Sequence, residues 1–70
     1  MKKTYKLENL DCAHCAEKMQ ERISKLEGVD KASINFVLQK ITLEGEDIPS
    51  LLPKIQKEIN MVEEDCKIVY

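Results

Sequence analysis

Apolar and polar positions alternate in four segments of the chain, and this period-two pattern predicts half-buried strands. The second and third segments are separated by only a few residues around Val37 and Leu38, which predicts a hairpin even though the turn has no Asn-Gly or Asp-Gly pair. The four predicted strands are residues 2–9, 29–36, 39–44 and 65–70.

A helical period appears first after residue 12, where apolar side chains recur three and four positions apart. The helix should begin near Ala13, and we expect Gly28 to end it as a C-terminal cap. Its expected buried stripe consists of Ala16, Met19, Ile23 and Leu26.

A second helix is predicted before the last strand, and its prolines indicate where it begins. Proline is harmless only in the first turn, where the backbone N–H has no helical partner. With Ser50 as the N-cap, Pro53 falls in that turn, so we expect regular helix from about Leu51 to about Asn60. The apolar stripe of this segment is Ile48, Leu51, Leu52, Ile55 and Ile59.

The predicted element order is β-α-β-β-α-β. Two helices on one face of a four-stranded antiparallel sheet make an α+β, ferredoxin-like sandwich. We expect residues 1–70 to form one domain, since no linker, repeat or low-complexity segment interrupts them.

Composition narrows the range of functions. The chain has 70 residues, 43% hydrophobic and 34% charged, which is a globular composition with little room for an enzyme cleft. The net charge is −2 and no basic stripe is present, which argues against nucleic acid as a partner. We therefore expect a non-catalytic domain with a shallow surface site.

Targeting signals are not evident. No apolar run approaches the roughly 18 residues that a membrane helix needs, and no signal peptide follows Met1. Three cysteines are a poor disulfide framework, whereas a reducing compartment keeps thiols free. These features predict a cytoplasmic segment without direct membrane insertion.

Cys12 and Cys15 form a CxxC motif where the first strand gives way to the first helix. Two such cysteines can turn both sulfurs toward one point when the first lies in a loop and the second in the first helical turn. The unpaired N–H groups and partial positive charge of a helix N-terminus stabilise a thiolate and lower its pKa. Thiolates bind soft metal ions, so the motif predicts a metal site.

The segment Asn9–Ala16, followed by Leu26–Val29 and Ala32–Phe36, resembles the heavy-metal-associated domain family. The resemblance covers essentially the whole chain and implies the same β-α-β-β-α-β fold. Members of that family act as small metallochaperones or as cytoplasmic N-terminal domains of metal-pumping P-type ATPases. The resemblance therefore implies a metal ion and the membrane domains of an ATPase, or another metal-carrying protein, as partners.

The residues before the first cysteine depart from the family pattern. The family commonly has Gly-Met-Thr there, and this chain has Asn9-Leu10-Asp11. Leu10 can replace the packing role of the Met, whereas the Asp11 carboxylate adds an oxygen donor that suits Zn(II), Cd(II) or Pb(II) better than Cu(I). Copper-type members tend to have an aromatic residue or Lys after the second helix, which the loop at Asn60–Glu63 lacks.

Two other functions are retained as alternatives. The first is a free-standing metallochaperone, which could carry Cu(I). The second is a dithiol redox module, since redox proteins also place CxxC at a helix start. The redox interpretation is disfavoured because its fold needs a longer chain and because the Asp11 carboxylate would raise a thiol pKa.

His14 and Cys66 are the remaining candidate ligands. His14 lies between the cysteines, but its side chain should face solvent if the helix begins near Ala13. Cys66 should lie near the metal loop, since the last strand runs antiparallel beside the first. We nevertheless favour the interpretation of Cys66 as a small buried hydrophobic residue.

An open metal site could also support a metal-bridged dimer.

Overall fold

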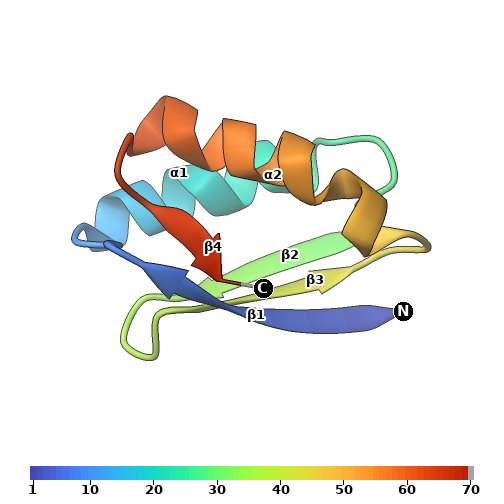
Figure 1. Cartoon of the computed structure of the whole chain (residues 1–70), viewed down its shortest axis with the longest axis horizontal. Helices are drawn as coiled ribbons and strands as arrows, with labels where there is room; N and C mark the ends of the chain where they lie inside the picture. The colour runs from blue at the N-terminus through green and yellow to red at the C-terminus, as the bar shows by residue number, and fades with distance from the viewer. Residues whose placement is uncertain (70) are drawn as a thin grey trace.

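The computed structural model describes residues 1–69, and two helices cover one face of a four-stranded sheet in it (Figure 1). The observed order is β-α-β-β-α-β, as the sequence predicts. The elements are β1 (Lys2–Glu8), α1 (Ala13–Ser24), β2 (Lys31–Asn35), β3 (Lys40–Glu44), α2 (Ile48–Val62) and β4 (Lys67–Val69).

The sheet has the strand order β2-β3-β1-β4, and every neighbouring pair is antiparallel. Leu7 near the end of β1 is paired with Ile68 of β4. The chain just before β4 therefore lies at the same end of the molecule as the loop between β1 and α1 (Figure 1). This arrangement confirms the predicted ferredoxin-like topology and brings Cys66 to the end of the molecule that carries the CxxC motif.

The core lies between the helices and the sheet, where the predicted apolar stripes meet. Ala16, Met19 and Ile23 of α1 are buried, which confirms three of the four residues predicted for that stripe. From α2, the buried side chains are Ile48, Leu52, Ile55 and Ile59. Buried strand residues include Leu7, Ala32, Ile41, Leu43 and Ile68.

The predicted end of the first helix was wrong. Helix α1 ends at Ser24, with Lys25 as its C-cap, so Leu26 packs against the core from a turn. Gly28 instead has a φ of +94° in the turn that follows, a conformation that side-chain-bearing residues rarely adopt. The chain reverses there and reaches β2 after Val29.

The predicted start of the second helix was also wrong. Helix α2 begins at Ile48, with Asp47 as its N-cap, and contains Pro53 in its interior. The earlier start places Ile48 in the core at 1% exposure, and this burial offsets the backbone hydrogen bond that Pro53 cannot donate. The helix also continues two residues beyond Asn60, to Val62.

The remaining strand boundaries differ by a few residues. The last strand begins at Lys67 rather than residue 65, because residues 64–65 form a turn; the predicted strand end at Tyr70 lies outside the described residues. The predicted hairpin is confirmed, and Asn35 shapes its turn by accepting a 3.0 Å hydrogen bond from the Leu38 N–H.

None of the helices within residues 1–69 is long and apolar enough to cross a membrane.

Candidate metal site

Cys12 is the N-cap of helix α1, and Cys15 lies in the first turn of that helix. The Sγ atom of Cys12 accepts a 3.2 Å hydrogen bond from the Cys15 backbone N–H. A sulfur therefore takes the position usually occupied by a Ser or Asp oxygen and satisfies one unpaired N–H of the helix start. Both cysteines are half-buried and reduced, in the loop-and-helix placement that the motif predicts.

The two thiols of the motif differ in acidity. The Cys15 thiol donates to the Cys12 sulfur, and together with the backbone N–H groups of Cys15 and His14 this lowers the pKa of Cys12. The same thiol–thiol hydrogen bond, helped by burial, raises the pKa of Cys15. The helix start predicts a lowered thiol pKa, and this prediction is confirmed for Cys12 only. Cys12 is therefore the cysteine that ionises first.

The metal loop is fixed by a contact that the sequence does not signal. Leu10 is 2% exposed, which confirms its predicted packing role. The side-chain amide of Gln39 donates to the Leu10 carbonyl at 2.7 Å and accepts from the Leu10 N–H at 3.2 Å. Gln39 belongs to the turn between β2 and β3, so the hairpin holds the loop that carries Cys12.

Asp11 and His14 both face solvent. Within residues 1–69, no three His, Cys, Asp or Glu side chains are grouped closely enough to form a preassembled metal cage, so the Asp11 carboxylate is not gathered with the two thiols. His14 is exposed as predicted, with its Nδ1 3.8 Å from Glu17. The role of Asp11 as a ligand stays a prediction.

Cys66 is completely buried, as its interpretation as a core residue predicts. Its backbone carbonyl accepts 2.9 Å hydrogen bonds from the side chains of Gln56 and Asn60. Burial raises the pKa of the Cys66 thiol to about 11, and the carboxylates of Glu63 and Asp11 contribute. Cys66 lies inside the core in this conformation, so its thiol is not presented to an ion at the surface.

Glu63 is the residue at this end of the molecule that sequence reasoning missed. It is the C-cap of α2, and its Oε2 atom is buried without a hydrogen-bond partner among the described residues. Its negative charge raises the pKa of Cys12, Cys15 and Cys66, although it is not the largest influence on any of them. An acidic residue after an amphipathic helix is common in sequences, so nothing in the pattern distinguishes Glu63 from Glu64.

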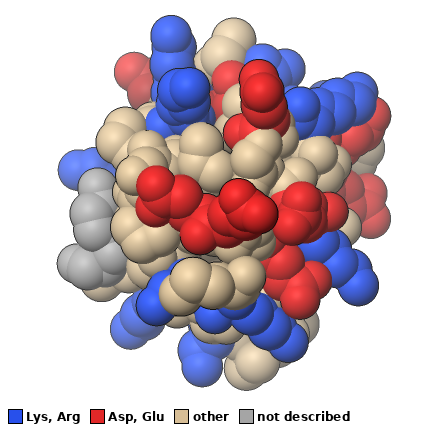
Figure 2. Space-filling view, turned by 90° about the vertical axis from the view of Figure 1, so that its right-hand side faces the viewer, with Lys and Arg blue, Asp and Glu red and all other residues tan. Residues whose placement is uncertain are grey.

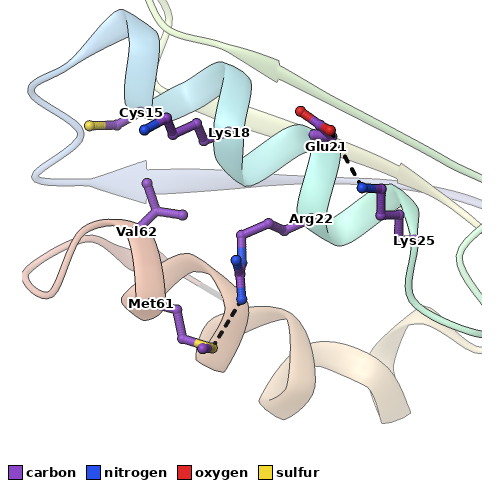
Figure 3. A pocket seen from close by; sticks show the side chains of 7 residues that line it. All are labelled: Cys15, Lys18, Glu21, Arg22, Lys25, Met61 and Val62. Carbon is purple, nitrogen blue, oxygen red and sulfur yellow. Dashed lines mark hydrogen bonds and ion pairs between the residues drawn. The ribbon is translucent and has the colours of Figure 1, made fainter.

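A shallow groove between α1 and α2 leads away from Cys15 (Figure 3). Lys18 lies one helical turn after Cys15, and Val62 of α2 lies across the groove from that cysteine (Figure 3). Farther along, Arg22 donates to the Met61 sulfur at 3.3 Å and pairs with Glu58 at 3.1 Å. The groove leaves the Cys15 side of the motif accessible, while the contacts of Arg22 link α1 to α2.

A band of acidic side chains crosses the end of the molecule opposite the CxxC loop, with Lys and Arg side chains above and below it (Figures 1 and 2). Acidic side chains there border a depression between the loop after α1 and the start of α2, namely Glu27, Asp30, Glu46 and Asp47. No metal-binding group of three such side chains forms there either, as for the whole described part of the chain. The candidate site is the thiol pair because its two soft ligands lie together at the start of α1.

Comparison with protein families matches residues 4–61 to the heavy-metal-associated domain. Among curated proteins, a probable cadmium-transporting ATPase of Listeria monocytogenes is 40% identical over 45 residues, or 64% of this chain and 6% of that protein. The copper-exporting P-type ATPase of Bacillus subtilis is 40% identical over 43 residues, or 61% of this chain and 5% of that protein. This chain thus spans only a small part of these relatives.

Solved structures give the same fold. The CsoZ metallochaperone has a TM-score of 0.78 at 28% identity, and the alignment covers 100% of this chain and 97% of the other. The N-terminal domain of a potential copper-translocating P-type ATPase from Bacillus subtilis, in the Cu(I)-loaded state, has a TM-score of 0.77 at 27% identity, covering 96% and 84%. Domains of this kind bind metal and are not catalytic. The match over residues 4–61, on the fold and the thiol pair described above, establishes that the chain belongs to the heavy-metal-associated domain family.

Proposed function

We propose that the chain carries one Zn(II), Cd(II) or Pb(II) ion as cargo on Cys12, Cys15 and Asp11. The observation that carries the proposal is the Cys12 sulfur at the helix start, which receives the Cys15 N–H at 3.2 Å and has a lowered pKa. Because the Cys12 thiolate forms readily before the metal binds, less free energy is needed to release its proton on binding. Cys15 would lose its proton when the ion binds, since coordination stabilises its thiolate.

Asp11 supports the assignment to a divalent ion. Its carboxylate is exposed on the residue before Cys12 and has no structural role in the core, so it is free to turn toward an ion held by the thiols. Zn(II) and Cd(II) accept oxygen ligands alongside sulfur, whereas Cu(I) is satisfied by soft donors alone. The relatives named as cadmium-transporting ATPases are consistent with this cargo.

The site would serve delivery rather than storage. Two half-buried sulfurs at one end of the molecule leave part of the ion accessible, so an incoming ligand can bind before the old ligands leave. We propose that residues 1–70 form a domain on the cytoplasmic side that passes the ion to the membrane domains of a P-type ATPase, either as part of that pump or as its partner.

A second candidate is a metallochaperone for Cu(I). It is favoured by the absence, within residues 1–69, of a third ligand gathered with the two thiols, because two sulfurs are sufficient for Cu(I). It is also consistent with the likeness to a domain solved in the Cu(I)-loaded state.

A competitive titration of the reduced protein with Zn(II), Cd(II) and Cu(I) distinguishes the two candidates. We expect Asp11→Asn to weaken Zn(II) and Cd(II) binding by about tenfold or more and to leave Cu(I) binding nearly unchanged. Asp30→Asn is the matched control, since Asp30 is an exposed aspartate in the acidic band at the opposite end of the molecule. Equal effects of Asp11→Asn on all three ions would refute the divalent assignment.

A further inference from the structure

The face of the sheet that the two helices leave uncovered is basic. Both helices lie on the other face, so within residues 1–69 no element packs on this one (Figure 1). Side chains alternate along a strand, so the neighbours of the buried strand residues point away from the core. Exposed lysines from all four strands lie on this uncovered face, namely Lys2, Lys6, Lys31, Lys40 and Lys67. Two glutamates, Glu8 and Glu44, share the face, so it carries a net charge of +3 in a chain whose net charge is −2.

The fold assembles this surface from positions spread along the whole chain, which is why no basic stripe appears in the sequence. The hydroxyl oxygens of Thr4 and Thr42 lie 3.3 Å apart, so side chains of β1 and β3 meet at the centre of the face. A shallow depression on it is lined by Lys2, Lys31, Ser33, Thr42 and Glu44. Figure 2 also shows Lys and Arg side chains below the acidic band, on the side of the sheet.

Two of the lysines lie directly opposite each other. Lys6 of β1 is the register partner of Lys40 of β3, and both side chains are exposed. Like charges at directly opposite positions of an antiparallel pair destabilise the sheet. No ion pair joins any of the five lysines to a carboxylate within residues 1–69. The uncovered face therefore carries a repulsion that an external negative charge would relieve.

The kind of partner follows from how these charges are distributed. Protein interfaces are enriched in Arg and aromatic side chains and depleted in Lys, and within residues 1–69 the uncovered face has neither Arg nor an aromatic side chain. Single-stranded nucleic acids need aromatic side chains on which their bases stack. Lysines spread over an open sheet instead suit a broad surface of anionic lipid headgroups, to which each lysine near the surface adds attraction.

We infer that the uncovered face of the sheet docks on an anionic phospholipid surface. Docking would be adsorption without insertion, because Val69 is the only large apolar side chain that the described residues place on this face. The helices then lie on the side away from the lipid, so the groove beside Cys15 stays free for a protein partner (Figures 1 and 3). The inference goes beyond the proposed function, since the charges that carry it do not include the thiols and docking requires no metal.

The test is cosedimentation of the metal-free, reduced protein with phosphatidylcholine vesicles that contain phosphatidylglycerol, at low ionic strength. We expect Lys6→Gln/Lys40→Gln to lower the partition coefficient by about tenfold or more, since it removes two charges that face the lipid. Lys54→Gln/Lys57→Gln is the matched control, because it removes the same charge from exposed positions on α2. The control should retain most of the wild-type binding, and salt should weaken binding of the wild type.

Several results would overturn the inference. Equal losses in the two double variants would show that binding follows net charge and not the sheet face. Absence of wild-type binding, or equal binding to vesicles of phosphatidylcholine alone, would exclude an anionic lipid surface. Binding to polyglutamate or to an oligonucleotide without binding to the vesicles would assign the face to another macromolecule.

Two further measurements keep these outcomes interpretable. Far-UV circular dichroism verifies that each variant is folded; should Lys6→Gln/Lys40→Gln not fold, Lys2→Gln/Lys31→Gln removes the same charge from the other end of the face, and unchanged binding in it is equally contradictory. The metal titration of the same wild-type protein tests the proposed function separately, so either proposal can fail while the other stands.

Discussion

The side chain of Gln39 holds both backbone groups of Leu10, with its Nε2 2.7 Å from the Leu10 carbonyl and its Oε1 3.2 Å from the Leu10 nitrogen. The same Nε2 also donates to the Phe36 carbonyl at 2.9 Å. One side chain therefore ties the turn between β2 and β3 to the loop that presents Cys12. We regard this contact as the support that keeps the first sulfur in place before metal binds.

Gln39→Ala should loosen that support. The variant leaves the backbone groups of Leu10 without their partner in a partly buried region, so we expect the free energy of unfolding to fall by about 2 kcal/mol. Urea denaturation measures the loss. Gln39→Glu is the informative control, because a carboxylate still accepts from the Leu10 N–H but cannot donate to the Leu10 carbonyl. Wild-type stability in Gln39→Ala would show that the loop does not depend on this contact.

The three cysteines should differ in reactivity in the metal-free, reduced protein. Alkylation requires the thiolate, so Cys12, whose pKa is lowered, should react faster at neutral pH than Cys15, whose pKa is raised. Cys66 is fully buried and should not react until the protein unfolds. Mass spectrometry after brief iodoacetamide treatment measures the order, and modification of Cys66 as fast as Cys12 would contradict the structure.

Cys66 should make stability depend on pH at the alkaline end. Its pKa is about 11 in the folded protein against 9.0 for the free thiol. The folded state therefore favours the protonated form, and this contribution is complete below about pH 9 and is lost as the pH rises toward 11. The loss is at most about 3 kcal/mol. Urea denaturation across this range should give a steeper decline for the wild-type protein than for Cys66→Ala, and parallel curves would refute the prediction.

Gly45 should not tolerate a side chain. Its position faces the Gly28 carbonyl so closely that an added Cβ would overlap that oxygen, and the N–H of Gly45 donates to the Met1 carbonyl at 2.9 Å. Gly45→Ala must move one of these backbone segments, so we expect a destabilisation of about 1–3 kcal/mol. Thermal unfolding measures it, with the exposed Ser33→Ala as a control that should change stability by less than about 0.5 kcal/mol. A neutral Gly45→Ala would mean that the two loops are not in close contact.

The order of elements and the place of the thiol pair could be predicted because local patterns determine them. Alternation marked the strands, helical spacing marked Ala16, Met19 and Ile23, and the change of period placed Cys12 and Cys15 at a helix start. The start of α2 was wrong because local rules for Pro53 were given more weight than the burial of Ile48, which depends on the tertiary fold.

The supporting residues of the site could not be predicted from sequence. Gln39 reaches Leu10 across 29 positions, and no motif signals that contact. Glu63 looks like any glutamate after a helix until the structure buries one of its oxygens, which has no hydrogen-bond donor within residues 1–69. Such contacts depend on how elements pack, so they appear only when the fold is known.

The central claim is that Cys12 and Cys15 together hold one metal ion. The most direct test is the Cd(II) stoichiometry of the reduced protein, measured after gel filtration for the wild type, for Cys12→Ser/Cys15→Ser and for Cys66→Ser. We predict one ion per chain in the wild type and in Cys66→Ser, and none in the double variant. Retention of the ion by the double variant, or its loss on changing Cys66 alone, would contradict the site described above.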